Sequence, residues 1–411
     1  MRPVGDPAAK NAHLLRYGPM SEAASTALIH SPQGVLTILV AVAAFFFWVE
    51  QRTGWKLFEF FPPLIFIYAT PVILNNTGVI PAASPVYGVM KSFGLPMFIC
   101  LMLLSVDVGK AVRILGRGVI VMLLGTLGIV VGGFFSYLIV HRWLDPDAWK
   151  GFGALAGSWI GGTGNLAAVA EMLGTPEEQM GLAVIADNVV YIVWLPIMIG
   201  SKGVADRFNR WAKVSKDRLA KMDEAAQAET DTKREPAMRD YLYLGVLAVA
   251  VTWIGGTLAE HLPEIGKVLT VGTWRVLVIT TMGIALSFTP AKRIPGSHNV
   301  AMAIVYVFVA RMGAQAALSG LDQAPAFLAG AFIWIFIHGA FCVLGARLLH
   351  VDIHSVAIAS AANVGGAASA PVVAAAHRES LVPASVLMAL LGYAMGTYMA
   401  WFMAWLCSLV A

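Results

Sequence analysis

The sequence predicts an all-α polytopic membrane protein built from two related halves. Hydrophobic residues make up 58% of its 411 residues, charged residues only 13%, and the mean hydropathy is +0.73. Soluble globular chains are about 45–50% apolar and about 25% charged, so this composition excludes an ordinary soluble domain. The pair Gly161-Gly162 recurs as Gly365-Gly366, and Val169-Ala170 recurs as Val373-Ala374. Both pairs are separated by 204 residues (365 minus 161 and 373 minus 169), which indicates an internal duplication.

Each half contains six apolar stretches near the length of about 20 residues that spans a bilayer. They fall at 35–49, 61–80, 88–106, 117–140, 151–173 and 181–200, and again at 240–260, 270–288, 297–317, 325–349, 354–376 and 383–410. The two sets correspond pairwise with an offset close to 204. We therefore divide the chain into an N-terminal segment (1–34), a first transmembrane repeat (35–200), a charged linker (201–239) and a second transmembrane repeat (240–411).

The charged linker orients the protein in the membrane. It carries ten Lys and Arg residues, and such residues are enriched in cytoplasmic loops, so we expect residues 201–239 to be cytoplasmic. If all six stretches span, the two halves have the same orientation. If 151–173 and 354–376 instead enter and return, each half has five spans and the repeats are inverted. The inverted arrangement places most loop Lys and Arg in the cytoplasm. The predicted fold is thus two inverted repeats of about five spans, each with a Gly-rich re-entrant or broken helix.

The glycine pairs lie in stretches that contain several small polar residues. An unpaired backbone group in lipid costs several kcal/mol, so a helix breaks at membrane depth only inside protein or beside an aqueous cavity. Helix N-termini at such a break favour an anion, and free carbonyls favour a cation. The predicted substrate-binding residues at the breaks are Ser158, Gly161, Gly162, Thr163, Gly164, Asn165, Asn363, Gly365, Gly366 and Ser369. The alternative is close helix packing by small residues, which needs no ligand.

Two charged residues extend the predicted site. Asp187, followed by Asn188, lies in an apolar run that contains no basic residue. A carboxylate within a membrane is costly and marks a functional site, so we predict that this pair holds Na⁺ or that Asp187 carries a coupled proton. The alternative is a hydrated position near the membrane surface. Arg311 is predicted to bind a substrate carboxylate or to pair with Asp107, its counterpart 204 residues earlier; the alternative is an Arg that reaches the interface from a helix end.

Other features argue against several function classes. The chain has no phosphate-binding loop and no nucleophile paired with a base, so we do not expect an enzyme or a bound cofactor. Its three cysteines, Cys100, Cys342 and Cys407, are isolated, which predicts neither a disulfide nor a Cys/His metal site. The net charge of +4 gives no reason to expect a nucleic-acid partner. His338 stands alone in an apolar stretch, and we interpret it as an interhelical hydrogen bonder.

Three stretches carry a resemblance to a known family: 157–171, the Ala-Asp-Asn of 186–188, and 360–373. They resemble the YjcL-like family of bacterial membrane proteins, a domain of unknown function, over nearly the whole chain from about residue 35. The Gly-Gly-Thr-Gly of 161–164 is also similar to the tips of sodium–glutamate symporters. That likeness implies inverted five-span repeats, re-entrant loops and elevator motion. We expect the protein to lie in the bacterial inner membrane. The second half departs from this pattern, since Ala367-Ala368 follow its glycine pair.

These observations together predict an ion-coupled secondary transporter, using Na⁺ or H⁺, for a small organic solute that we expect to be anionic. Alternating access would move a unit that contains the Gly-rich segments against a static scaffold. The expected partners are the solute, membrane lipid and a second copy of the chain in a homodimer. The alternative is a membrane solute receptor or channel-like protein without coupled turnover. Ion-dependent affinity for the solute distinguishes a transporter from a simple receptor.

Overall fold

The computed structural model is helical throughout the residues that it describes, which are 27–55, 57–60, 63–106, 116–215, 234–266, 268–316 and 321–411. Extended pairing in these ranges is limited to one bridge between Ile265 and Leu269. The first half contains α2 (Pro32–Thr53), α3 (Leu57–Phe60), α4 (Pro63–Asn76), α5 (Pro85–Val89), α6 (Leu95–Leu104), α8 (Arg117–Val140), α9 (Ala148–Leu173), α10 (Glu177–Gly200) and α11 (Ala205–Ala212). The second contains α13 (Met238–Glu260), α14 (Val271–Ser287), α15 (Ser297–Gln315), α16 (Ala324–Leu349), α17 (Ile353–Asn363), α18 (Gly366–His377) and α19 (Val382–Ser408). The all-α prediction is confirmed for the described residues.

Seven helices or continuous helical stretches are long and apolar enough to cross a membrane. They are α2, α5 with α6, α8, α10 with α11, α13, α16 and α19. The apolar helices α4 and α14 are shorter, which gives about seven to nine candidate spans in the described part of the chain. Only 17% of the apolar window of α2 and 28% of that of α13 is buried, because these helices present apolar side chains outward. Such surfaces are stable in lipid and not in water, so the protein is an integral membrane protein with multiple spans.

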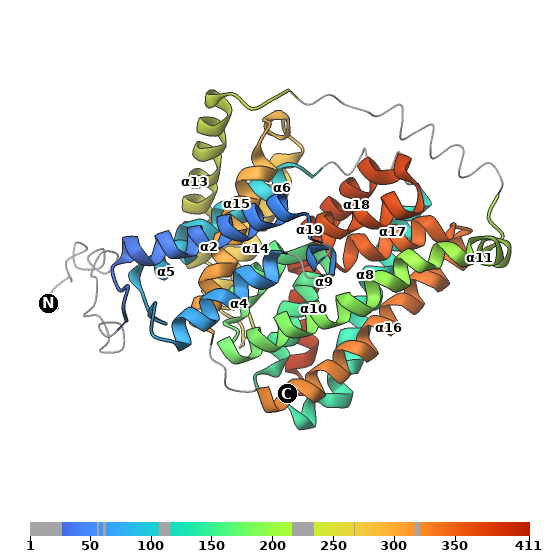
Figure 1. Ribbon diagram of the computed structural model, residues 1–411, viewed down its shortest axis with the longest axis horizontal. Coiled ribbons are helices and arrows are strands. Elements are labelled where there is room, and N and C mark those ends of the chain that lie inside the picture. The colour runs from blue at the N-terminus through green and yellow to red at the C-terminus, as the bar shows by residue number, and fades with distance from the viewer. Residues whose placement is uncertain are drawn as a thin grey trace, which may run out of the picture.

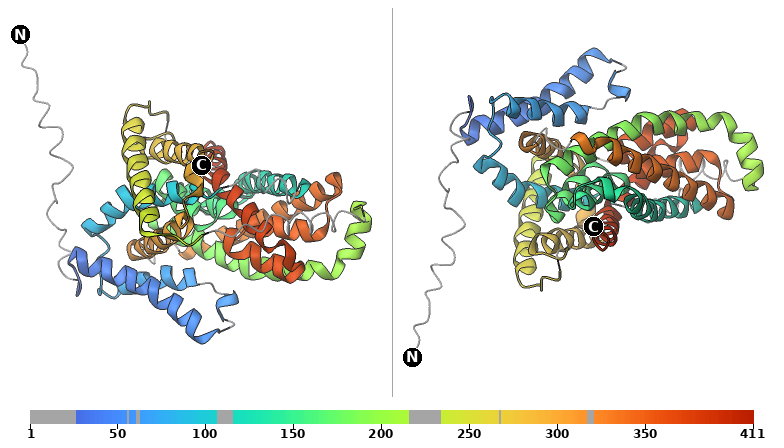
Figure 2. Two further views of the ribbon diagram at one scale, coloured as in Figure 1. Left: turned by 90° about the horizontal axis from the view of Figure 1, so that it is seen from above. Right: turned by 90° about the horizontal axis from the view of Figure 1, so that it is seen from below.

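The helices form two groups that lie side by side (Figure 1). We call α8–α10 and α16–α19 the hairpin group, and α2, α4–α6 and α13–α15 the flanking group. Within the hairpin group, α8 packs along α16 and α9 along α19; within the flanking group, α15 packs on α4 and α14 on α6. The groups meet where α6, α14 and α15 contact α9 and α19. Figure 2 shows α2 on the outer side of the flanking group. Each group therefore combines helices from both halves of the chain.

Small residues let α8 and α16 approach closely. A Cβ added at Gly133 would lie 2.7 Å from the Trp334 ring, and one added at Gly128 would lie 2.7 Å from Phe341 Cβ. The indole N–H of Trp334 donates to the carbonyl of Ile129 at 2.7 Å, which fixes the ring against α8. This contact joins the two halves at the centre of the hairpin group.

We expect Gly133→Leu to destabilise the protein by about 1–3 kcal/mol, because the added side chain overpacks the contact with Trp334. The measurement is the apparent melting temperature in detergent. Gly245→Leu on α13 is the matched control, since no atom lies within 4 Å of a Cβ at that position. Equal melting temperatures for the two variants would contradict this packing.

Candidate functional site

The helix α9 is folded back on itself at Gly161-Gly162. Gly161 has φ −134° and ψ 19°, and Gly162 has φ 68° and ψ −173°, so neither is helical. In a straight helix residues 153 and 173 would be roughly 30 Å apart. Instead, a Cβ at Gly153 would lie 2.5 Å from the side chain of Leu173, and one at Gly157 would lie 3.1 Å from that of Val169. The sequence permits this because small residues line the contact between the arms. We call α9 the first hairpin.

The segment from α17 to α18 forms a second hairpin of the same kind. Its break contains Gly365 with φ 123° and Gly366 with φ 61°, conformations that favour glycine. At the open end, His354 Nδ1 lies 3.0 Å from His377 Nδ1, which places the start of α17 beside the end of α18. The carboxylate of Asp352 accepts from the backbone N–H of Ser355 at 2.9 Å and so caps the first turn of α17.

The tips of the two hairpins meet. A Cβ at Gly366 would lie 3.5 Å from the Cα of Gly162, so the backbones of the two tips are in contact. The ring of Tyr393, from α19, packs against both glycines, 3.2 Å and 3.5 Å from their Cβ positions. The structure thus brings together two breaks that are 204 residues apart in the sequence (366 minus 162). Side chains larger than glycine would separate them.

The open ends of the hairpins lie at opposite ends of α10. The first hairpin ends at Gly174, three residues before α10 begins at Glu177. The second hairpin instead lies beside the residues that follow α10, because Lys202 Nζ donates to the carbonyl of Ala376 at 2.9 Å and Asn209 Oδ1 accepts from the N–H of Ile353 at 3.1 Å. A helix of 24 residues is about 36 Å long, which is enough to cross a membrane. The hairpins therefore enter the bundle from opposite ends.

Asn165 and Asn363 hold the tips by the same arrangement of hydrogen bonds. The amide of Asn165 donates to the carbonyl of Tyr393 at 3.0 Å, and its oxygen accepts from the hydroxyl of Thr397 at 2.7 Å. On the other hairpin, the amide of Asn363 donates to the carbonyl of Met122 at 3.1 Å, and its oxygen accepts from the hydroxyl of Thr126 at 3.2 Å.

Each of these amides thus fits one turn of a neighbouring helix, with a carbonyl at one position and a threonine four residues later. Asn165 also donates to the carbonyl of Gly161 at 3.0 Å, across the first break. Both side chains are fully enclosed, at 1% and 0% exposure. The binding predicted for Asn165 and Asn363 is therefore already directed to the protein, and both act as positioning residues in this conformation.

Asp187 lies beside the first tip. Its Oδ2 accepts from the hydroxyl of Ser158 at 2.7 Å, and its Oδ1 accepts from the indole N–H of Trp159 at 2.9 Å. One turn further along α10, the ring of Tyr191 packs against the second tip, with its Cε2 3.1 Å from the Cβ position of Gly365. The helix α10 thus contacts both tips, the first through a carboxylate and the second through a phenol.

Two predicted residues lie apart from this arrangement. The amide of Asn188 donates to the carbonyl of Val184 in its own helix at 2.7 Å, so it does not join Asp187. Arg311 forms an ion pair with Glu171 near the open end of the first hairpin, and Lys91 Nζ lies 2.6 Å from the same carboxylate. The structure therefore does not bring Arg311 to the tips, because a closer acidic partner neutralises it. Its other proposed partner, Asp107, lies outside the described residues.

Sequence reasoning missed the aromatic members of the site. Trp159, Tyr191 and Tyr393 occur in apolar stretches where an aromatic residue carries no signal of its own. The spacing from Asp187 was an available clue, since positions four and seven residues later share its helix face. These positions hold Tyr191 and Trp194, and the indole N–H of Trp194 donates to the hydroxyl of Ser360 in the second hairpin at 2.9 Å.

His338 is an interhelical hydrogen bonder, as its isolation in the sequence suggested. One ring nitrogen lies 2.9 Å from the carbonyl of Gly125 on α8, and the other lies 2.9 Å from the hydroxyl of Ser360 on α17. The ring is fully enclosed. It therefore joins α8, α16 and the second hairpin in one network.

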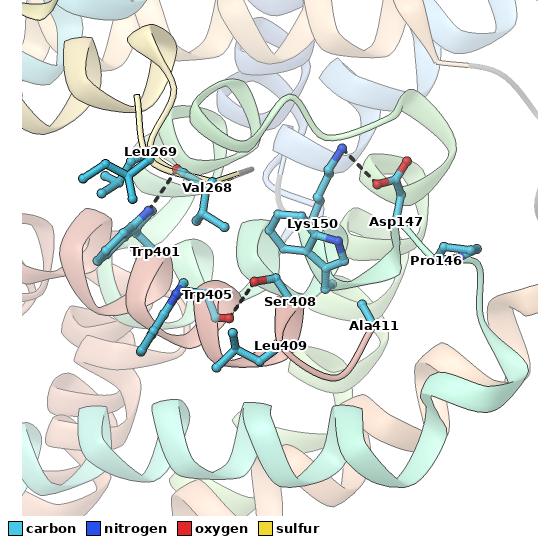
Figure 3. A pocket seen from close by; sticks show the side chains of 13 residues that line it. Pro146, Asp147, Lys150, Val268, Leu269, Trp401, Trp405, Ser408, Leu409 and Ala411 are labelled. Atoms are coloured by element: carbon cyan, nitrogen blue, oxygen red, sulfur yellow. Dashed lines mark hydrogen bonds and ion pairs between the residues drawn. The ribbon is translucent and has the colours of Figure 1, made fainter. Parts of the chain in front are cut away.

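A cavity of about 880 Å³ lies at the open end of the first hairpin (Figure 3). It is lined by residues of the loop between α13 and α14, by the start of α9 and by the end of α19, including Trp149, Trp401 and Trp405. Lys150 projects there and pairs with Asp147 at 2.9 Å. None of the predicted site residues lines it, so it is separate from the tips. Within the described ranges, no group of three or more His, Cys, Asp or Glu side chains is placed to hold a metal.

These features define a class of protein: an integral membrane protein in which the first and second halves of the chain each contribute a hairpin, broken at a glycine pair, to a common centre. The chain belongs to the family described as "Protein of unknown function (DUF819)", whose profile matches residues 37–409. It is 27% identical over 366 residues to a protein of Bacillus subtilis (strain 168) described as "Uncharacterized membrane protein YjcL". That alignment covers 86% of this chain and 91% of the relative. The family predicted from the tip motifs is thus confirmed, and the relative is a bacterial membrane protein.

We expect Asn363→Ala and Asn165→Ala each to lower the free energy of unfolding by about 1–3 kcal/mol, because each leaves enclosed partners without a hydrogen bond. Thermal unfolding of the purified protein measures the loss. Asn188→Ala is the control and should have a smaller effect, since its amide bonds only its own helix. A loss in Asn188→Ala as large as in the other two would refute the clamping role.

Proposed function

We propose that this protein is a secondary transporter that couples a small organic solute to Na⁺ or H⁺ by alternating access. The observation that carries the proposal is the meeting of two Gly-broken hairpin tips beside a membrane carboxylate. Discontinuous helices that meet near the middle of a bundle are the usual substrate and ion sites of such transporters. A bundle that served only as structure would have no need for broken helices at this depth, since unbroken helices satisfy their own backbone.

Inverted repeats are part of the proposal. The two hairpins enter from opposite ends of α10, and α10 belongs to a stretch long and apolar enough to span. Repeats of opposite orientation would place corresponding segments in this way. With the linker on the cytoplasmic side, the first hairpin opens to the outside and the second to the cytoplasm, so that each could gate one side of the same site.

The substrate class follows from what the tips offer. The second arm of each hairpin begins at the tip, so two helix N-termini point to the centre with their partial positive charge. Thr163 is half-buried there, and Ser158 and Ser369 supply hydroxyl groups. Because Arg311 is paired elsewhere, these dipoles and hydroxyls are the groups that would bind a small organic anion.

Movement of the hairpin group against the flanking group would alternate the access. The ion pair between Arg311 and Glu171 crosses the boundary between the groups, and Lys91 reaches the same carboxylate from the flanking side. An elevator movement requires such contacts to break and form again. The flanking group would be the static part, and its exposed apolar faces on α2 and α13 suit lipid or a second copy in a homodimer. A solute receptor or channel-like protein is the second candidate.

We expect a screen of small organic acids, each with Na⁺ or K⁺ and at several pH values, to find a compound that raises the melting temperature. A ligand present at 100 times its Kd stabilises the folded state by about 2.7 kcal/mol. Gly162→Leu should abolish the shift because the side chain separates the tips. Gly200→Leu, at a position with open space around it, should keep the shift.

Ser369→Ala, a milder change, should weaken the shift. Full retention of the shift in Gly162→Leu would exclude the tips as the binding site. Binding that is indifferent to both pH and Na⁺ would favour a receptor.

We expect Asp147→Cys and Lys202→Cys to react with a membrane-impermeant maleimide from opposite sides of sealed vesicles. They lie at the open ends of the first and second hairpin, respectively. The natural cysteines are all buried, so the background is low. Labelling of both positions from the same side would contradict the inverted arrangement.

A further inference from the structure

We infer that Asp187 is a proton-binding site and that the coupled ion is H⁺ rather than Na⁺. This inference rests on the proposed transport function and chooses between the two ions that the function leaves open. It stands on the hydrogen bonds of one carboxyl group, which are compatible with both of its protonation states and poorly compatible with a metal cation.

The oxygen Oδ1 of Asp187 faces a group that can only donate. The indole N–H of Trp159 is 2.9 Å away, and an indole nitrogen has no acceptor capacity. A carboxylate oxygen accepts this bond, and so does the C=O of a protonated carboxyl. Oδ1 keeps a second lone pair, but a Na⁺ ion there would lie beside a hydrogen with partial positive charge, where a cation site would place a further oxygen ligand. The ring of Trp159 is held in place by Trp334, with centroids 4.8 Å apart, so the N–H stays directed at Oδ1.

The oxygen Oδ2 faces a group that can reverse its role. The hydroxyl oxygen of Ser158 is 2.7 Å away, and a hydroxyl both donates and accepts. When Asp187 is ionised, Ser158 donates to Oδ2. When a proton from water forms an O–H bond at Oδ2, that group donates to Ser158, whose own hydrogen rotates away. Both states therefore keep two hydrogen bonds without movement of a heavy atom, which suits a group that gains and loses a proton.

The surroundings offer no fixed charge to hold Asp187 in one state. No basic side chain of the described residues pairs with it. Tyr191 is the titratable group that faces it from its own helix, and its ring packs against Gly365 at the second tip. The arm of α9 presents only Ser158 and Trp159, and α16 presents the Trp334 ring behind them.

The histidine on the same side of the bundle is already engaged. The ring nitrogens of His338 lie within hydrogen-bond distance of the carbonyl of Gly125 and the hydroxyl of Ser360. The hydroxyl of Ser360 also accepts from Trp194, so its hydrogen is free for the ring, and the other nitrogen donates to the carbonyl. A neutral imidazole ring can form both of these hydrogen bonds. The bonds of His338 thus fit a neutral ring, whereas those of Asp187 fit both of its protonation states.

Proton binding at Asp187 would act on the first hairpin directly. Both of its partners belong to the arm just before the first tip. Tyr191 on the same helix instead contacts the second hairpin. Hydrogen bonds to an ionised acceptor are about twice as strong as those to a neutral one. Loss of the charge therefore weakens the attachment of the first tip to α10 and biases the tips toward separation, which is the differential interaction that coupling requires.

The test is infrared difference spectroscopy of the purified protein between alkaline and acidic pH, without any substrate. We expect a band of a protonated carboxyl that is absent in Asp187→Asn and present in Asp145→Asn. In Trp159→Phe, which removes the N–H bonded to the C=O, this band should move to higher frequency, a signature that a merely structural role of Asp187 would not produce. An unchanged band in Asp187→Asn would overturn the inference.

A second arm compares Na⁺ with K⁺ at equal ionic strength in thermal unfolding. We expect equal melting temperatures. A stabilisation specific to Na⁺ that is lost in Asp187→Asn but kept in Asp145→Asn would assign the site to Na⁺ and overturn the proton. Because neither arm uses a solute, failure here leaves the transport proposal to be judged by the ligand screen and Gly162→Leu.

Discussion

The need to satisfy backbone hydrogen bonds inside an apolar bundle governs the rest of this structure. Two helices are interrupted at its centre, and each interruption frees carbonyl and N–H groups that lipid cannot solvate. The chain meets this need with two enclosed asparagines, each of which binds a carbonyl and a threonine hydroxyl on a neighbouring helix. Asn165 in addition takes up the carbonyl of Gly161, within the break itself. These hydrogen bonds hold the irregular tips against continuous helices.

The polar residues around the tips are of two kinds: some hold the tips in place, and others can change their hydrogen-bond partners. Asn165, Asn363 and His338 have their polar atoms directed to backbone or hydroxyl partners, and their removal would affect the fold. Ser158, Ser369 and Tyr191 carry hydroxyl groups, which can rotate and exchange one partner for another. A site that alternates between occupied and empty states needs both kinds, because the frame must persist while the contacts to the ligand change.

Much of the fold and part of the site could be predicted from the sequence. Apolar stretches predicted the helix positions closely, and the 204-residue repeat identified both breaks, because a glycine pair recurs in register at each of them. Asp187 could be singled out because a carboxylate within an apolar run is costly and therefore marks a functional site. The role of Arg311 could not be predicted in the same way. Its partner, Glu171, is 140 residues away in the chain, and proximity of that kind is created by packing between helices.

The aromatic contacts are a second feature of the site that could not be predicted from the sequence. In the sequence, Trp159 and Tyr191 look like ordinary apolar residues. The role of the single polar atom on each side chain depends on the residue that it faces in the folded protein. Likewise, Asn165 and Asn363 look like ligands because polar residues beside a glycine pair are typical of binding tips. Their hydrogen bonds to other protein groups depend on α19 and α8 packing beside them, and no local sequence pattern predicts that packing.

The asparagine contacts also have a consequence for how the chain is made. Asn165 and the carbonyl of Tyr393 are separated by 228 residues, and Asn363 and the carbonyl of Met122 by 241. During synthesis the first hairpin therefore enters the membrane long before the helix that completes its hydrogen bonds exists. Until the second half has been made, the amide of Asn165 lacks the carbonyl of Tyr393 as a partner. Neither half closes its own tip, so the native centre of this protein is assembled only once both halves have left the ribosome.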